Sequence, residues 1–434
     1  MARILIATTP AMGHISPLVP IAKALIGRGH DVRWYTATKY RTRVEASGAQ
    51  FVGYSRARDF DDANIDEEFP GRARLRGLAQ LKFDMKHVFI DAAPDQAADI
   101  REIVQSFPAD VLMYDAAMIG GLLVHEQSGP PSLAVGVVPM LMSSVDTAPF
   151  GLGLQPSTNP FRRIRNRLLN WFVQNVAFRD VQVHWQAMRA RLQMHPTGWW
   201  LNHVTRSTFY VQPSVPGFEY ARSDLANNVE FVGMIPPEQS AGVTTPPFWD
   251  ELDGSRPVVH VSQGTIANAT PDLIAPTLEG LAGEDVLVVV STGNRPIEQL
   301  KLGELPQNAR IAPFLSYPDL LPKTSVMVTN GGYGGVQMAL SYGVPLIVGG
   351  ASEDKPEVAA RVAWSGAGLN LKTGRPKPQA VRTAVRRVLD DPRYRTRARA
   401  LASQYRSYDP IGRVIQIVES MASGASTDAR RRSA

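Results

Sequence analysis

Short apolar runs alternate with amphipathic segments through the first part of the chain. Strand-like apolar runs occupy residues 4–8, 32–36, 111–114 and 133–138. Between the first two runs, residues 18–27 carry apolar side chains at helical spacing. Continuously apolar strands joined by amphipathic helices are typical of a parallel sheet that helices cover on both faces. The pattern therefore predicts a doubly wound α/β domain over residues 1–211.

A second series with the same alternation follows. Its strand-like runs occupy residues 257–261, 286–290, 308–314, 326–329 and 346–348. This series predicts a second doubly wound, Rossmann-like domain over residues 248–411, so the expected fold class is two such α/β domains facing a cleft. The length of 434 residues agrees, because domains of roughly 100–200 residues predict two or three of them.

The segments outside these two series differ in character. Residues 212–247 are rich in Pro, Gly and Ser and are predicted to connect the domains. Residues 412–422 have apolar positions at helical spacing, so we expect a helix that packs back onto the first domain. Residues 423–434 are polar and are expected to form a flexible tail.

Residues 160–194 combine large apolar side chains with many arginines. This combination predicts one or two amphipathic helices. Such helices can lie on a membrane surface or pack against a neighbouring sheet. We favour packing against the sheet of the first domain.

Composition excludes several classes of protein. Hydrophobic residues make up 44% of the chain and charged residues 20%, as in globular proteins. There is no cysteine, which excludes disulfides, thiolate nucleophiles and Cys-ligated metals. The formal charge of +6 comes from local groups of arginines, so nucleic acid is not an expected partner. We expect a cytoplasmic protein without a transmembrane segment, because the sequence shows neither a signal-like leader nor an apolar run of about 18 residues.

A histidine and an aspartate follow two strands of the first predicted sheet. Ligands of doubly wound folds bind at the carboxyl ends of the strands. His14 follows the run at 4–8, and Asp115 closes the run at 111–114. Because a general base needs a partner that orients it, these residues are a candidate catalytic dyad. The ordinary alternative is a structural histidine.

A glycine-rich turn is the most specific ligand-binding feature of the second domain. Between the run at 326–329 and a predicted helix stand Asn330, Gly331, Gly332, Tyr333, Gly334 and Gly335. Four glycines at a strand-to-helix turn expose backbone N–H groups beside the positive end of a helix, which suits a diphosphate. The spacing is neither that of the dinucleotide fingerprint nor that of the P-loop. A purely structural turn would need only one or two of these glycines.

Three further features extend this predicted donor pocket. A second small-residue loop follows the run at 257–261 and comprises Ser262, Gln263, Gly264 and Thr265. An acidic group follows the run at 346–348 and comprises Glu353 and Asp354, with Lys355 next to them. Carboxylates accept hydrogen bonds from pairs of sugar hydroxyls. Phe314 is placed to stack on a planar base, and a core position is an equal alternative for it.

The motifs resemble those of a known family. Its pattern is carried by GHISPLVPIAKAL, by the pair Tyr114-Asp115, and by NGGYGGVQMALSYGVPLIVGG followed by EDKPEVAARV. These segments are similar to the inverting nucleotide-sugar glycosyltransferases of the two-Rossmann (GT-B) type, in particular the bacterial branch that acts on macrolides, polyketides and phenols. The resemblance spans nearly the whole chain. It implies that His14 is the general base, that Asp115 orients it, and that the glycine-rich helix start binds the donor diphosphate.

The sequence departs from the family pattern in the donor region. Asn330 stands where the family has His, Gly335 where it has Ser or Thr, and Met338 where it has Glu. Lys355 replaces the Gln of the Asp-Gln pair that reads the sugar. The backbone donors of the loop are unaffected by these changes. We therefore expect a nucleoside-diphosphate sugar of the UDP or TDP type to bind. The identity of its sugar does not follow from these residues.

The implied chemistry is inversion without a metal. His14 removes the proton of an acceptor hydroxyl as its oxygen attacks the anomeric carbon, and Asp115 stabilises the imidazolium. Backbone N–H groups at residues 332–335 and the helix dipole stabilise the departing nucleoside diphosphate. Residues Asp59 to Asp61 match a DxD metal pattern, but they follow no apolar strand. We assign no metal and no cofactor besides the sugar-nucleotide co-substrate.

The acceptor is expected to lie against the first domain, near His14. Methionines and aromatics form adaptable apolar walls, and the candidates are Met12, Phe83, Met85, Phe89, Met140, Met142 and Phe150. As a group they predict a small lipophilic hydroxylated acceptor, although each is equally a candidate for the core. The chain is expected to be a monomer or a homodimer.

Two other functions stay open at this point. A sugar-nucleotide epimerase also uses paired Rossmann domains and a diphosphate site, but it needs no acceptor. A degenerate family member would bind a nucleotide sugar, or act as an auxiliary protein, without turnover. The substitutions at Asn330, Gly335 and Met338 allow this second alternative, and the presence of both His14 and Asp115 argues against it.

Overall fold

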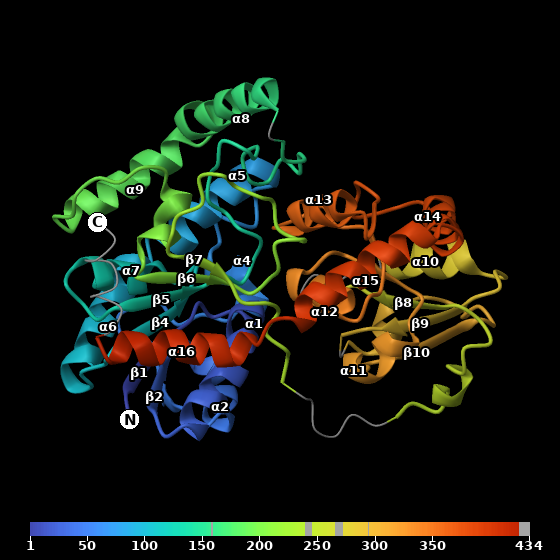
Figure 1. Ribbon diagram of the computed structural model, residues 1–434, viewed down its shortest axis with the longest axis horizontal. Helices are drawn as coiled ribbons and strands as arrows, with labels where there is room; N and C mark the ends of the chain where they lie inside the picture. The colour runs from blue at the N-terminus through green and yellow to red at the C-terminus, as the bar shows by residue number, and fades with distance from the viewer. Residues whose placement is uncertain (158, 239–244, 265–271, 294, 425–434) are drawn as a thin grey trace.

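The chain folds into two α/β domains, each built on one parallel sheet (Figure 1). The structure is a computed structural model that describes residues 1–157, 159–238, 245–264, 272–293 and 295–424. Two parallel sheets with helices around them confirm the fold class predicted from the alternating pattern. Thr265 and most of the tail at 423–434 lie outside the described residues.

The first sheet has seven strands in the order β3-β2-β1-β4-β5-β6-β7. They are β1 (Arg3–Ala7), β2 (Asp31–Tyr35), β3 (Gln50–Val52), β4 (Val111–Asp115), β5 (Ser132–Val135), β6 (Phe209–Gln212) and β7 (Val229–Phe231). The order reverses between β1 and β4, where Ala7 is in register with Tyr114. Doubly wound folds bind ligands at such a reversal.

The second sheet repeats this arrangement with six strands in the order β10-β9-β8-β11-β12-β13. They are β8 (Val258–Ser262), β9 (Leu287–Ser291), β10 (Ala309–Ala312), β11 (Val326–Thr329), β12 (Leu346–Val348) and β13 (Gly368–Asn370). The order reverses between β8 and β11, where Ser262 is in register with Thr329. Each domain therefore has one reversal point that can hold a ligand.

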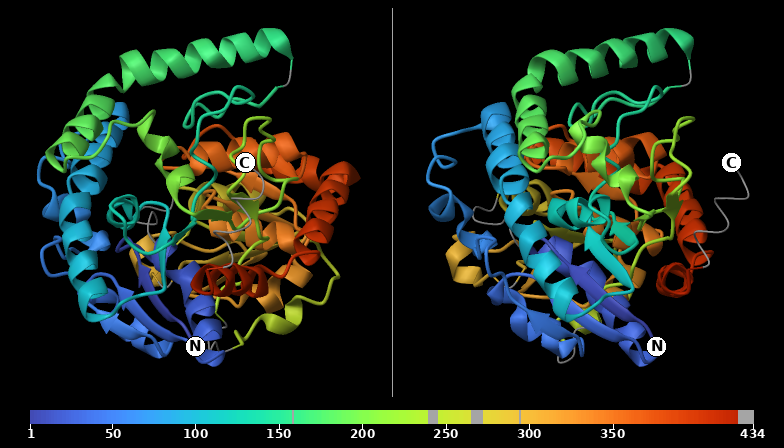
Figure 2. Two further views of the ribbon diagram at one scale, coloured as in Figure 1. Left: turned by 60° about the vertical axis from the view of Figure 1, so that its left-hand side comes forward. Right: turned by 90° about the vertical axis from the view of Figure 1, so that its left-hand side faces the viewer.

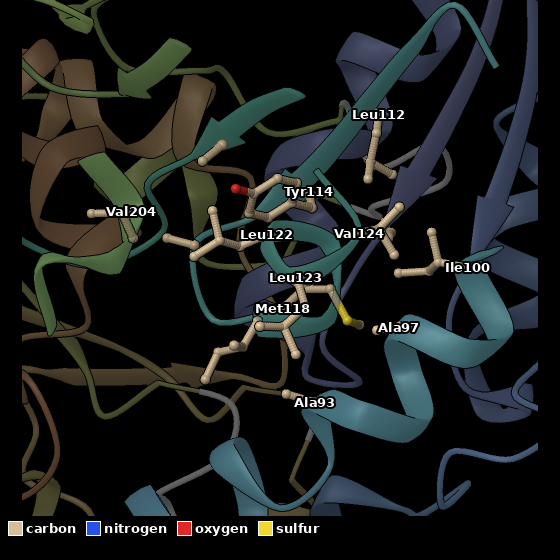
Figure 3. Packing of buried hydrophobic residues seen from close by; sticks show 14 of the residues in the cluster. Ala93, Ala97, Ile100, Leu112, Tyr114, Met118, Leu122, Leu123, Val124 and Val204 are labelled. Atoms are coloured by element: carbon tan, nitrogen blue, oxygen red, sulfur yellow. The ribbon is translucent and has the colours of Figure 1, made fainter. Parts of the chain in front are cut away.

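Most helices pack against the two sheets because they bury their apolar faces there, and α8 is an exception. The first part of the chain forms α1 (Met12–Ile15), α2 (Val19–Gly27), α3 (Arg41–Ala46), α4 (Ile65–Glu68), α5 (Gly77–Phe83), α6 (Ala93–Ser106), α7 (Ile119–Glu126), α8 (Pro160–Phe172) and α9 (Arg179–Arg191). The second part forms α10 (Ile274–Leu281), α11 (Tyr317–Leu320), α12 (Tyr333–Ser341), α13 (Lys355–Ser365), α14 (Pro378–Asp390), α15 (Pro392–Arg406) and α16 (Pro410–Ala422). Figure 3 shows Leu112 and Tyr114 of β4 packed with Ile100 of α6 and Leu122 of α7.

The two domains exchange core residues. Between β6 and β7 the chain leaves the first sheet, and Val215 and Phe218 lie fully buried in a core cluster with second-domain residues such as Leu340. In the opposite direction, α16 crosses back to the first domain (Figure 1), where Val414 is fully buried in a cluster with Ile4. Each core is thus completed by a segment from the other side of the structure.

Residues 212–247, predicted as a connection, include part of the first sheet. Gln212 closes β6, and β7 pairs parallel with it, placing Gln212 opposite Phe231. Strand β7 has the sequence VEF, so a charged residue interrupts its apolar pattern and no continuous apolar run marks it. Residues 239–244 of this segment lie outside the described residues.

The packing expected for residues 160–194 is wrong for α8. Helices α8 and α9 form, but Asn166 is the one residue of α8 that is buried. The large apolar side chains of α8 and of the residues after it are exposed, including Phe161, Leu168 and Trp171. The helix contacts the protein through polar side chains, which a hydrophobic pattern cannot indicate.

Candidate functional site

His14 and Asp115 meet at the strand-order reversal of the first sheet. His14 lies in α1, just after β1, and Asp115 is the last residue of the adjacent β4. His14 Nδ1 lies 2.7 Å from Asp115 Oδ1. The side chain of Asp115 is fully buried, whereas that of His14 is 19% exposed. With Nδ1 bonded to the carboxylate, Nε2 is the ring nitrogen that remains to accept a proton.

Backbone and hydroxyl donors hold the Asp115 carboxylate in place. Thr9 N donates to Oδ2 at 2.6 Å, and Ala117 N donates to Oδ1 at 2.9 Å. The Thr9 hydroxyl lies 3.3 Å from Oδ1. A carboxylate fixed in this way fixes the imidazole ring in turn. Sequence reasoning missed Thr9, although a polar residue directly after a buried strand is a usable signal.

The electrostatics of His14 suit a general base. Burial lowers the pKa of His14, but the charge and hydrogen bond of Asp115 outweigh burial, so the pKa lies above its usual 6.5. A base is most effective when its pKa lies near the working pH. The dyad can therefore accept a proton from a weakly acidic group such as a hydroxyl.

The glycine-rich loop of the second domain leads into the start of α12. Gly332 precedes the helix, and Val336 N donates to Gly332 O at 3.0 Å. The N–H groups of Tyr333, Gly334 and Gly335 come before this bond and have no acceptor within the helix. They lie at the positive end of the helix dipole, which favours an anion.

The four glycines of this loop have different roles. Gly331 has φ +91°, and a Cβ there would lie 2.7 Å from Val348 Cγ1, so the fold requires glycine at this position. A Cβ at Gly332, Gly334 or Gly335 would meet nothing within 4 Å. Packing therefore does not explain these three glycines, and the bare backbone borders open space that a ligand can enter.

Asn330 joins the two small-residue loops of the second domain. Its Nδ2 donates to the backbone oxygen of Gln263, and its Oδ1 accepts from Gly332 N at 3.4 Å. Ser262 ends β8 beside β11, and Gly264 follows with φ +80°. The Asn330 amide is thus hydrogen-bonded within the protein. The main donors available to a phosphate are therefore the backbone N–H groups of the loop.

Asp354 brings an acidic group to the same edge of the sheet. It precedes α13, and its side chain makes no capping bond to that helix. Burial raises the pKa of Asp354 to about 6, with Lys355 opposing the rise and Glu353 adding to it. Asp354 raises the pKa of His14 and His14 lowers the pKa of Asp354, so the two groups lie within electrostatic range of each other although they come from different domains.

The remaining predicted residues take varied positions. Glu353 is exposed and forms an ion pair with buried Lys355. Phe314 is 39% exposed and lies beyond the end of edge strand β10, where it lines a hollow of about 600 Å³ with Pro247 and Phe248. This hollow lies three strands away from β11 in the sheet order.

The predicted acceptor residues divide into buried and partly buried ones. Met140 and Met142 are 1% and 5% exposed and belong to the first-domain core. The partly buried residues are Met12, Phe83, Met85, Phe89 and Phe150. Met12 shares α1 with His14, and the ring of Phe83 lies 4.6 Å from that of His87. Met140 and Met142 therefore contact protein atoms in this structure instead of an open surface.

A buried network that sequence reasoning missed ties the glycine-rich loop to the first domain. The hydroxyl of Tyr333 donates to Glu219 Oε1 at 2.8 Å and accepts from Gln212 Nε2 at 2.9 Å. Arg361 Nε donates to Glu219 Oε2 at 2.9 Å, and Nη1 donates to Glu357 Oε2 at 2.8 Å. Burial lowers the pKa of Arg361, but these two carboxylates outweigh it and raise the pKa above its usual value.

The network continues into a loop of the first domain. Glu357 Oε1 accepts from the N–H groups of Gly151 and Gly153, both at 2.8 Å. The local signal for this network is an arginine among apolar residues in the segment VAARVAW. The network therefore joins the glycine-rich loop and α13 to residues of the first domain.

Two further observations concern the part of the chain that the structure describes. Within it, no three His, Asp or Glu side chains gather closely enough to hold a metal ion. None of its helices combines the length and the apolar character that crossing a membrane requires.

The chain is similar to known proteins over nearly its whole length. Residues 275–421 match the family model for the Erythromycin biosynthesis protein CIII-like, C-terminal domain. Over 422 residues the chain is 42% identical to the 4'-demethylrebeccamycin synthase of Lentzea aerocolonigenes, an alignment that covers 97% of this chain and 99% of that protein. It is 33% identical to UDP-glycosyltransferase 2 of Phaeomoniella chlamydospora, covering 96% and 95% of the two chains.

Solved structures share the fold. The glycosyltransferase VinC in complex with DTDP matches with a TM-score of 0.69 and 19% identity, covering 97% of this chain and 99% of that one. At this identity the match concerns the arrangement of the two sheets and their helices, which both chains share.

Proposed function

Because the chain belongs to the nucleotide-sugar glycosyltransferases of the GT-B type, in the branch that acts on natural products, we propose that it transfers a hexose or deoxyhexose with inversion. The donor is a UDP- or TDP-sugar, and the acceptor is a hydroxyl of a small lipophilic molecule. The observation that carries this proposal is the hydrogen-bonded His14–Asp115 pair at the strand-order reversal of the first sheet.

In the proposed reaction, Nε2 of His14 takes the proton of the acceptor hydroxyl as the oxygen attacks the anomeric carbon. The bond from that carbon to the diphosphate oxygen breaks, and the nucleoside diphosphate leaves with the electron pair. Asp115 stabilises the imidazolium through Nδ1. Attack from the side opposite the leaving group inverts the configuration.

The glycine-rich loop is assigned to the leaving group. The N–H groups of Tyr333, Gly334 and Gly335 and the dipole of α12 stabilise charge that grows on the diphosphate as the bond breaks. The carboxylate of Asp354 is assigned to sugar hydroxyls, because it is free of capping bonds and lies near the base. In this assignment the anomeric carbon lies between His14 and the loop.

The names of similar proteins support the two substrate classes. One relative is named a UDP-glycosyltransferase, and the fold neighbour VinC was solved with DTDP. The relative with 42% identity is named as a 4'-demethylrebeccamycin synthase, so an acceptor of the natural-product type is the one we propose here. These names leave both UDP and TDP as donors to test.

The deciding experiment is the His14→Ala variant. We expect kcat/KM to fall by about 10²–10⁴-fold, the usual contribution of a general base, while donor affinity measured by calorimetry stays unchanged. His195→Ala, which alters an exposed histidine, is the matched control. A loss smaller than about tenfold at every pH would contradict the assignment. Conversion of the donor into its epimer without any acceptor, seen by product analysis, would indicate an epimerase instead.

A further inference from the structure

Helix α8 faces the protein with its polar side. Asn166 is fully buried, and Asn170 Nδ2 donates to the backbone oxygen of Thr147 at 3.1 Å. Arg163 Nε donates to Asp146 Oδ1 at 2.7 Å, and Gln174, just after the helix, donates to Ser143 Oγ at 3.0 Å. These bonds all reach residues 143–147, so they fix which side of the helix is turned inward.

The apolar side of α8 is therefore turned outward. Its exposed side chains are Phe161 (82%), Ile164 (53%), Leu168 (63%), Trp171 (61%) and Phe172 (50%). A soluble amphipathic helix normally buries this side against its own domain. A contiguous group of large, solvent-exposed apolar side chains marks a surface that binds another protein or a membrane.

The charge of this region indicates what covers it. Residues 160–179 contain five arginines, at positions 162, 163, 165, 167 and 179, and no acidic residue. Arg165 is four residues from Phe161, and Arg167 is four residues from Trp171, so both border the apolar side. Arg162 and Arg167 are exposed and form no ion pair in the described part of the chain. The surface is apolar at its centre and cationic at its margin.

The helix also lies at an extremity of the molecule. In both views of Figure 2, α8 runs along one outer edge, away from the two sheets. A flat surface can reach a helix in this position along its whole length. Phe, Leu and Trp on one side with arginines beside them is the composition of helices that lie in the plane of a membrane interface.

We propose that α8 binds the surface of an anionic lipid bilayer, with its axis parallel to the membrane plane. Phe161, Leu168 and Trp171 enter the boundary between headgroups and acyl chains, and the arginines contact anionic headgroups. The side that docks onto residues 143–147 stays on the protein, so binding requires no rearrangement of the fold. The binding is peripheral and independent of the transfer reaction.

The test measures binding of the full chain to vesicles without donor or acceptor. Vesicles of equal parts phosphatidylcholine and phosphatidylglycerol should sediment the protein, and pure phosphatidylcholine should sediment much less of it. Leu168→Gln should lower the partition coefficient by about 10–100-fold, the effect of losing one buried leucine. Arg162→Gln and Arg167→Gln should each lower it by about fivefold. These side chains are exposed, so circular dichroism should show an unchanged fold.

A matched control and a spectroscopic measurement complete the test. Tyr342→Gln alters another exposed large side chain, 40% exposed on the second domain, and should bind like the wild type. Brominated lipid should quench part of the tryptophan fluorescence of the wild type. This quenching should be absent in Trp171→Phe. Equal binding of all variants, or equal binding to neutral and anionic vesicles, would overturn the proposal. A dimer that forms without lipid and is abolished by Leu168→Gln would also overturn it, by assigning the surface to a second copy of the chain.

Discussion

Asp115 Oδ1 lies 2.7 Å from Nδ1 of His14, and this carboxylate is the main group that raises the pKa of His14 above 6.5 against the lowering effect of burial. In Asp115→Asn the charge is lost while burial remains, so the pKa of His14 should fall. A base acts in its neutral form, so the acidic limb of kcat/KM should move to lower pH. We also expect a lower maximal rate, because the imidazolium loses its stabilising partner. An unchanged pH profile would remove Asp115 from the mechanism.

The open space beside Gly334 gives a test of the donor loop. A Cβ at this position meets nothing within 4 Å, so Gly334→Val should fold normally while its side chain occupies space assigned to the diphosphate. Donor affinity should fall by about 10–100-fold, equivalent to one or two charge-assisted hydrogen bonds. Calorimetry with UDP- and TDP-sugars measures the change.

Two further glycines serve as controls for this variant. Gly198→Val adds the same side chain where a Cβ also meets nothing within 4 Å, and it should bind the donor normally. Gly331→Val should instead lower the melting temperature, because φ is +91° and Val348 lies in the way. Normal donor affinity in a folded Gly334→Val protein would show that the loop does not hold the diphosphate.

The pKa of Asp354, raised by burial to about 6, predicts a pH dependence of donor binding. In the proposed role, the carboxylate accepts hydrogen bonds from sugar hydroxyls with both oxygens above this pKa, and below it one oxygen carries a proton. The KM for the donor sugar should therefore rise as pH falls through about 6. In Asp354→Asn this dependence should disappear. Steady-state kinetics at saturating acceptor measures it, and a variant that keeps the wild-type dependence would assign the titration to another group.

Transfer should proceed without a divalent metal. The proposed mechanism gives the leaving-group charge to backbone N–H groups and the dipole of α12, which is the task that Mg²⁺ or Mn²⁺ performs elsewhere. The initial rate should therefore be the same in excess EDTA. Complete loss of activity that Mn²⁺ restores would reveal a carboxylate site, and Asp59, Asp61 and Asp354 would be the first residues to replace.

Continuously apolar runs were sufficient to predict the strands beside the candidate site. The runs at 326–329 and 346–348 coincide with β11 and β12, and the run at 111–114 ends one residue before β4 does. These strands are buried on both faces, so nearly every residue in them is apolar. Strands β7 and β13 lie at the edges of their sheets, and their sequences, VEF and GLN, contain polar residues, so they gave no such run.

Other features depend on contacts that no local pattern contains. The hydrophobic spacing of α8 predicts a helix, but its orientation follows from bonds between Asn170 and a loop more than twenty residues earlier. Glu219 and Arg361 are 142 residues apart in sequence, and each is stable in the core only because the other is present. Pairs of residues so far apart in sequence can be identified only from the folded structure.

The exchange of core residues between the domains has a consequence for chimeric enzymes. A junction near residue 247 divides the chain between the two sheets. It separates Val215 and Phe218 from the second-domain core in which they are buried, and α16 from the first-domain core in which it is buried. A chimera built there from two relatives would insert foreign side chains into both cores, and mismatched volumes in a packed core lower stability. Transferring residues 213–220 together with the second domain, while keeping the native α16, preserves both sets of partners. The recombination boundary of this protein is therefore set by its cores and not by its connecting segment.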